Sequence, residues 1–220
     1  MYKIILIILI ALVFYSLPFF FSDTVISPDD MIYDFFSTHL ARTGRLSYRP
    51  PADALFGEKG FTPRYFVYNQ RGETLPRKFP GFILFWGAWK KLLPFPLTRL
   101  INPFCAVFSL LFLFGIGRII LPEVKDSLRA VVLLASSPLF IHRSFAYNAT
   151  LFNLTLFLAA LYFLLRALVH RQGWNYLLFG LIGGFSLWVR PTNVIYLLSL
   201  FSLFLLERKR LRLKIGRAHV

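Results

Sequence analysis

The sequence predicts an all-α fold, a polytopic bundle of transmembrane helices that carries one long extracytoplasmic loop. Of the 220 residues, 57% are hydrophobic and 18% aromatic, and the mean hydropathy of +0.62 exceeds that of an ordinary soluble domain. Charged residues make up 16% of the chain and fall between long apolar runs. Several runs approach the roughly 18 residues that a spanning helix needs.

We expect about six spans, at residues 4–21, 102–121, 128–141, 150–169, 174–189 and 192–206. The first lacks a small-x-small cleavage site and is long enough to span, which favours an uncleaved anchor. The third contains Ser136, Ser137 and Pro138, which predict a kink or a partly buried turn that joins it to its successor. The Lys and Arg residues of the short loops place the N-terminus inside, so that residues 22–101 form the outer loop.

The outer loop is predicted to contain two amphipathic helices on the membrane surface. Ser27 as N-cap, followed by Pro28, predicts the start of the first helix, and Gly44 predicts its end. The second, at Gly81 to Leu93, is expected to turn Phe82, Phe85, Trp86 and Trp89 to the interface, with Lys90 and Lys91 at the headgroups. Between the helices, residues 65–72 predict a short hairpin.

The formal charge of +15 does not point to nucleic acid, because the basic residues lie at the ends of apolar runs and in one loop. Anionic membrane lipids or a phosphorylated lipid are the expected partners. Cys105 is the one cysteine and lies within an apolar run, which excludes an internal disulfide and a paired-cysteine metal site.

The acidic pair Asp29-Asp30 is the strongest candidate for chemistry, because a carboxylate just beyond the first span could accept a proton from a hydroxyl nucleophile. Acids in the first turn also stabilise a helix through its dipole, so a structural role stays open. Asp30 stands three residues after Ser27 and could reach back to the N-cap amide. Asp29 has no such local task, which leaves its carboxylate for an acceptor.

Arg190 is predicted at the outer end of the fifth span, in a short loop where positive charge is normally avoided. Its planar fork suits a phosphate, although an arginine that snorkels to the interface would look the same. Arg143, in the expected outer turn 142–149, shares this placement. Lys78, Pro80 and Gly81 lead into the second surface helix, either as part of a substrate loop or as an ordinary Pro-Gly turn.

Together, an anchor helix, an outer loop that opens with Asp29-Asp30, a surface helix entered by Pro80-Gly81, and Arg190-Pro191 after a later span resemble the C-type (GT-C) glycosyltransferases. The pattern covers residues 1–206 and is most similar to the protein mannosyltransferase, aminoarabinose transferase and RgtA/B/C/D-like group. The resemblance implies an inverting membrane glycosyltransferase that uses a polyprenyl-phosphate sugar donor. The acceptor would be a glycan, lipid or protein hydroxyl on the outer face of a prokaryotic inner membrane, and no cofactor is implied.

By position, the resemblance implies that Asp29 is the general base, that Asp30 supports it, and that Arg190 contacts the donor phosphate. Family members commonly have Asp-Glu at the acidic pair and a further acid in the second outer loop, where residues 142–149 have none. No metal is therefore assigned.

The family is also commonly longer, so residues 1–214 are expected to be a truncated transmembrane domain. Residues 215–220 are expected to be a non-native sequencing-adapter tail.

The alternative function is a lipid or solute transporter, which would normally place ionisable groups near mid-membrane. The predicted span centres hold almost no charge, and this favours the enzyme.

Overall fold

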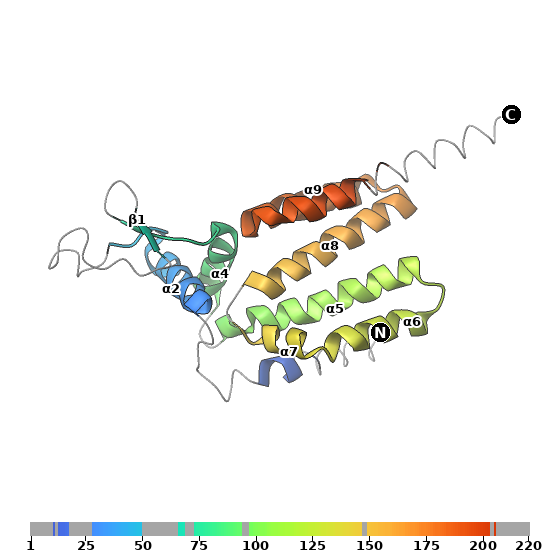
Figure 1. Cartoon of the computed structure of the whole chain (residues 1–220), viewed down its shortest axis with the longest axis horizontal. Helices are drawn as coiled ribbons and strands as arrows, with labels where there is room; N and C mark the ends of the chain where they lie inside the picture. The colour runs from blue at the N-terminus through green and yellow to red at the C-terminus, as the bar shows by residue number, and fades with distance from the viewer. Residues whose placement is uncertain are drawn as a thin grey trace. The chain divides into compact units, whose positions relative to one another are not determined.

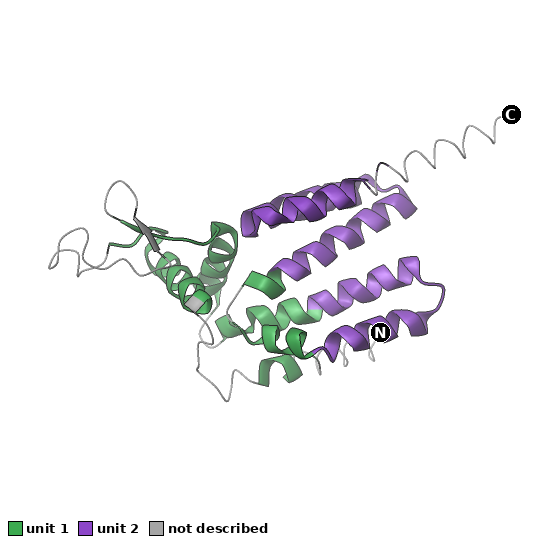
Figure 2. Ribbon diagram, in the orientation of Figure 1, with its two compact units in different colours: residues 1–107, 138–152 green, residues 108–137, 153–220 purple. Residues whose placement is uncertain are grey.

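The computed structural model describes residues 11, 13–17, 28–49, 66–68, 73–93, 97–146, 149–202 and 205. Most of these residues are helical, which confirms the predicted all-α class. They divide into two compact units (Figure 2): unit 1 comprises residues 1–107 and 138–152, and unit 2 comprises residues 108–137 and 153–220. Each unit is described by itself.

Unit 1 contains the two helices predicted in the outer loop. Helix α2 spans Pro28–Thr43 and α4 spans Pro80–Leu92, close to the predicted bounds. Gly44 ends α2 in the left-handed region at φ 72°, and its N–H donates to the Leu40 carbonyl at 2.8 Å. Glycine adopts this conformation without the strain that a Cβ would add, which is why it terminates helices.

Helices α2 and α4 pack against each other (Figure 1). The Tyr33 ring meets the Phe82 ring at 5.1 Å, and Leu40 further along α2 covers Gly87 further along α4. Side-chain contacts along both helices therefore hold the pair together.

The predicted membrane-facing position of Phe82 and Trp86 is wrong. Both side chains are buried, as are Ile32 and Phe36 on α2, because the apolar faces of the two helices cover each other. Phe85 is exposed at 37%. An apolar stripe has the same period whether lipid or another helix covers it, so the pattern alone did not reveal the partner.

The predicted hairpin is confirmed as β1 (Phe66–Tyr68) paired antiparallel with β2 (Thr74–Pro76). Its expected turn, residues 69–72, lies outside the described residues. Tyr48, just after α2, exchanges two backbone hydrogen bonds with Thr74, at 2.9 and 2.7 Å. This bridge joins the chain that leaves α2 to the strand that leads towards α4.

Within the described residues, two helices are long and apolar enough to cross a membrane. They are Leu97–Ile120, which consists of the 3-10 turn η1 (Leu97–Leu100) and α5 (Ile101–Ile120), and α8 (Ala149–His170). Helix α9 (Gly173–Val189) is apolar but shorter. Residues 194–202 are helical after the 3-10 turn η2 (Pro191–Asn193). Most of the predicted first span lies outside the described residues, so the count of six spans stays a prediction.

The predicted third span, 128–141, is two helices. Helix α6 spans Val124–Ala135 and α7 spans Pro138–Ser144, with the break at Ser136 and Ser137. Proline favours the first turn of a helix, where its missing N–H is not needed, so Pro138 starts a new helix. An interruption was predicted at this point, but as a kink or a turn to the next span rather than as two helices. The expected outer turn from residue 142 is wrong because α7 continues to Ser144.

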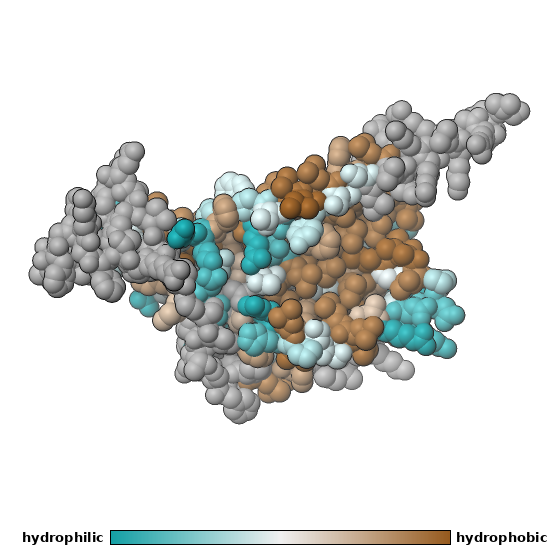
Figure 3. Space-filling view, in the orientation of Figure 1, coloured by the Kyte–Doolittle hydropathy of each residue, from teal (hydrophilic) through white to brown (hydrophobic). Residues whose placement is uncertain are grey.

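Unit 2 packs the rest of α5 and α8 with α6, α9 and residues 194–202. Its core includes Ala160, Leu164 and Leu200, and Ser109 on α5 meets Thr155 on α8 through a 2.8 Å hydroxyl contact. Figure 3 shows hydrophobic residues over much of this part of the surface, with hydrophilic residues at the turn between α5 and α6. Exposed apolar side chains here include Val132, Leu133, Leu181, Ile195 and Leu198.

Candidate functional site

Asp29 and Lys78, predicted separately as a general base and as part of a substrate loop, form an ion pair. Lys78 Nζ lies 2.8 Å from Asp29 Oδ2, and the side chains are 30% and 45% exposed respectively. Asp29 is in the first turn of α2 and Lys78 precedes α4 by two residues, so the contact joins the starts of the two helices. The sequence did not predict this contact, which ties the starts of the two helices together across 49 residues.

Asp30 has a different environment from its neighbour. Its relative exposure is 0%, and successive residues on a helix point about 100° apart, so Asp30 faces the interior while Asp29 remains open to solvent. Ser27, the predicted capping partner of Asp30, lies outside the described residues. One face of the first turn thus carries a buried acid, and another carries an acid that a substrate could reach.

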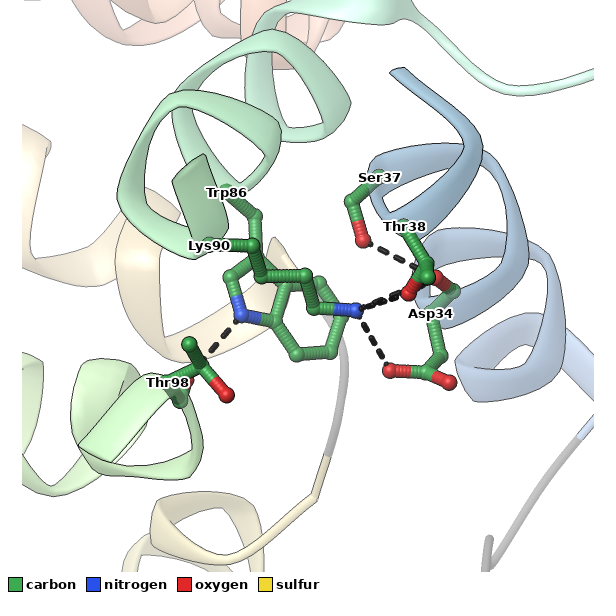
Figure 4. Close-up of polar contacts among 6 residues, drawn as sticks. All are labelled: Asp34, Ser37, Thr38, Trp86, Lys90 and Thr98. Atoms are coloured by element: carbon green, nitrogen blue, oxygen red, sulfur yellow. Dashed lines mark hydrogen bonds and ion pairs between the residues drawn. The ribbon is translucent and has the colours of Figure 1, made fainter. Parts of the chain in front are cut away.

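Lys90 makes a second ionic contact between the helices (Figure 4). The sequence did not predict this contact. Lys90 Nζ lies 2.6 Å from Asp34 Oδ1 and 2.8 Å from Thr38 Oγ1, and it also donates to the Asp34 carbonyl at 3.1 Å. It stands 4.1 Å from the centroid of the Trp86 ring. The expectation that Lys90 reaches lipid headgroups is wrong, because its side chain is only 11% exposed.

Burial lowers the pKa of Lys90 below its usual value, and the nearby Asp34 opposes this shift without cancelling it. Trp86 is fixed as well, since its Nε1–H donates to the Thr98 carbonyl at 3.2 Å. Asp34 follows Asp30 by one helical turn, and this spacing is the signal by which the sequence could have suggested a row of acids on α2. The contact between Asp34 and Lys90 connects α2 to the C-terminal end of α4.

Pro80 and Gly81 begin α4, with Phe79 as a residue before the helix that forms no side-chain cap. Gly81 is buried, and Pro80 occupies the position that favours proline in a first turn. These features explain why α4 begins at this point. A substrate role for either residue stays a prediction.

Arg190 lies where the sequence places it, immediately after α9, and its side chain is exposed. Its backbone is held on both sides. The Arg190 N–H donates to the Ser186 carbonyl at 2.9 Å, and the Arg190 carbonyl accepts from the Asn193 N–H at 3.0 Å. The Arg190 side chain therefore extends from a backbone turn that hydrogen bonds hold in place.

Arg143 occupies the last turn of α7 and is half-buried. It belongs to unit 1, with Asp29 and Lys78, whereas Arg190 belongs to unit 2. Among the described residues, no three His, Cys, Asp or Glu side chains are grouped to hold a metal ion. The arrangement in unit 1 can present a carboxylate beside an ammonium group, and the turn in unit 2 can present a guanidinium.

A protein-family model described as dolichyl-phosphate-mannose-protein mannosyltransferase matches residues 97–219, more than half of the chain. The match includes Arg143 and Arg190, whereas Asp29, Asp30 and Lys78 precede it. No curated protein and no solved structure matches the chain significantly.

Proposed function

The chain belongs to the dolichyl-phosphate-mannose-protein mannosyltransferase family, and from this premise we propose that it transfers a sugar from a polyprenyl-phosphate donor to an acceptor hydroxyl on the outer face of the membrane. Membership makes it a membrane glycosyltransferase of the mannosyltransferase type. Two helices with the length and hydropathy of spans agree with that setting. The acceptor is a glycan, a lipid or a protein.

In the proposed transfer, the acceptor oxygen forms a bond to the anomeric carbon while the bond from that carbon to the donor phosphate breaks. The acceptor proton passes to a carboxylate, and the polyprenyl phosphate leaves with the bonding electron pair. A transition state with positive charge on the sugar ring is typical of glycosyl transfer. The protein therefore needs a base on the acceptor side and positive charge beside the departing phosphate.

Asp29 is the proposed base, and its ion pair with Lys78 is the observation that carries the assignment. Lys78 contacts Oδ2 and limits rotation of the carboxylate, while 45% of the Asp29 side chain stays exposed to a substrate. A positioned base that is open on one side can meet an acceptor hydroxyl. Asp30, with 0% exposure, has the structural role.

Arg190 is the proposed ligand of the donor phosphate, and Arg143 is a second candidate. A guanidinium donates two parallel hydrogen bonds to a phosphate and keeps its charge at all relevant pH values. The exposed Arg190 side chain and the two hydrogen bonds to its backbone support this role. Neutralising the phosphate as it departs would lower the barrier.

The proposed base is tested by replacing Asp29 with Asn in detergent-purified protein and following sugar release from dolichyl-phosphate mannose without an ion gradient. We expect Asp29→Asn to lower turnover roughly 100- to 10,000-fold, the usual contribution of a positioned acid or base, with donor binding nearly unchanged. Lys78→Gln, which leaves the carboxylate but removes its partner, should give a smaller loss.

Asp30→Asn is the matched control, because it changes the adjacent acid in the same way. It should lower thermal stability by about 1 kcal/mol, as the loss of a helix-start contact does, and should leave most of the turnover. Normal turnover in both Asn variants would remove the acidic pair from the mechanism. Transport that requires an ion gradient, with no sugar release, would favour the transporter alternative.

A further inference from the structure

Two asparagine side chains form a reciprocal hydrogen-bonded pair inside unit 2. Asn153 Nδ2 donates to Asn193 Oδ1 at 3.2 Å, and Asn193 Nδ2 donates to Asn153 Oδ1 at 2.5 Å. Asn153 belongs to the second turn of α8, and Asn193 ends η2, 40 residues later. The Asn193 side chain is almost fully buried, at 3% exposure.

Asn193 also closes the turn that contains Arg190. Its Nδ2 donates to the Ser186 carbonyl at 2.9 Å, the same carbonyl that accepts from the Arg190 backbone N–H. Its own backbone N–H donates to the Arg190 carbonyl. Ser186 and Asn193 are thus joined across the turn, and Arg190 is hydrogen-bonded to both.

The pair attaches this turn to α8. Two hydrogen bonds between the amides of Asn153 and Asn193 join the segment from Ser186 to Asn193 to this helix. In apolar surroundings an amide that loses its partner is costly to leave buried, so the two amides favour a single arrangement. This arrangement fixes the Arg190 backbone relative to α8.

We propose that Asn193, held by Asn153, is a positioning residue for Arg190 and sets where the guanidinium meets the phosphate of a polyprenyl-phosphate donor. The inference rests on the proposed function of Arg190. Neither asparagine touches the donor. They limit the movement of the Arg190 backbone, from which the long side chain extends. Donor binding then costs less conformational entropy.

The test measures binding of undecaprenyl phosphate to the full chain in detergent. We expect Asn193→Ala to weaken binding about 3- to 15-fold, the range that corresponds to one interhelical hydrogen-bonded group in a membrane protein. Asn153→Ala should have a similar but smaller effect, since it leaves the bond from Asn193 to Ser186 intact. Because Arg190 is also proposed to neutralise the departing phosphate, kcat at saturating donor should fall as well.

Asn175→Ala is the matched control. Asn175 is also a buried asparagine of unit 2, but it donates to Gln172 at the opposite end of α9, at 3.1 Å. Its loss should affect thermal stability as much as the loss of Asn193 does, with donor binding unchanged. Equal effects of both variants on binding would mean that the asparagine pair only stabilises the bundle, and this would overturn the inference.

The Arg190→Ala background separates this inference from the function it rests on. If Asn193 acts through Arg190, Asn193→Ala should weaken binding no further once Arg190 is gone. A further loss of the full size would overturn the inference. If Arg190→Ala weakens binding and Asn193→Ala does not, the inference fails and the phosphate site stands. If Arg190→Ala binds normally, the phosphate role itself fails.

Discussion

The two units join their helices with different chemistry. In unit 1, α2 is attached to α4 by the ion pairs Asp29–Lys78 and Asp34–Lys90. In unit 2, α8 is attached to the turn after α9 by the uncharged amides of Asn153 and Asn193. The acid of each ion pair is 45% to 47% exposed, whereas Asn193 is 3% exposed.

The difference follows the cost of removing water. A half-exposed carboxylate keeps part of its hydration, so an ion pair forms without the full penalty of burying both charges. In a bundle of apolar helices two neutral amides satisfy each other at a far smaller desolvation cost. The comparison predicts that a polar contact between helices is ionic where a charge keeps part of its hydration, as in unit 1, and neutral where the contact is buried, as in unit 2.

The largest effect on stability is expected when the buried Lys90 loses the carboxylate that neutralises it. Asp34→Ala leaves the Lys90 ammonium, 11% exposed, without its carboxylate. We expect a loss of about 2 kcal/mol in the free energy of unfolding, below the value for a fully buried pair because Asp34 is half-exposed. Thermal unfolding in detergent measures the loss.

The double variant Asp34→Ala/Lys90→Met should recover part of that stability, since it removes the stranded charge together with its partner. Lys91→Met is the control, because Lys91 is an exposed lysine on the same helix and should change stability little. A double variant less stable than Asp34→Ala alone would mean that the ionic contact does not hold unit 1 together.

Helix spacing provides the next prediction, which compares a glycine from each unit. A methyl group at Gly117 on α5 would lie 3.1 Å from the backbone Cα of Ser127 on α6, whereas one at Gly87 on α4 would meet only the side chain of Leu40. A side chain can rotate away and a backbone cannot. We expect Gly117→Ala to destabilise by about 1–2 kcal/mol and Gly87→Ala by less.

Both glycines lie inside helices, so the gain in helix propensity from alanine is the same in each variant and cancels in the comparison. The measurement is the difference between the two melting temperatures. A larger loss at Gly87 would show that unit 1 depends on close approach as much as unit 2 does.

The smallest expected effect is a dependence of stability on alkaline pH that comes from Lys90. Because burial lowers the pKa of Lys90 in the folded protein, the unfolded chain binds more protons at pH values between the folded and unfolded pKa. Stability must then rise with pH in this window. Between the lowered pKa and the usual 10.5, wild-type protein should gain stability relative to Lys90→Gln. A wild-type protein that instead loses stability relative to the variant would contradict the direction of the shift.

Features that depend only on neighbouring residues could be predicted from the sequence. Gly44 ended α2 and Pro80 began α4 because backbone conformation at these positions is set locally. An interruption at Pro138 was predicted for the same reason, although the sequence suggested a kink rather than two helices. Arg190 was placed directly after α9 by its position beyond an apolar run.

Features that depend on distant residues were not predicted. The apolar face of α4 was assigned to the membrane because periodicity does not identify what covers a face, and α2 covers Phe82 and Trp86. Lys90 was assigned to headgroups for the same reason, although Asp34 binds it across 56 residues of chain. The partner of Asp29, 49 residues away, was likewise missed.

The separation of α2 and α4 along the chain sets an order of events during synthesis. The contact between Asp29 and Lys78 spans 49 residues. A ribosome that adds about 5–20 residues per second needs roughly 2–10 s to make that length. For this interval the apolar face of α2 has no partner helix. The nascent loop is therefore most open to aggregation or chaperone binding between the completion of α2 and the arrival of α4.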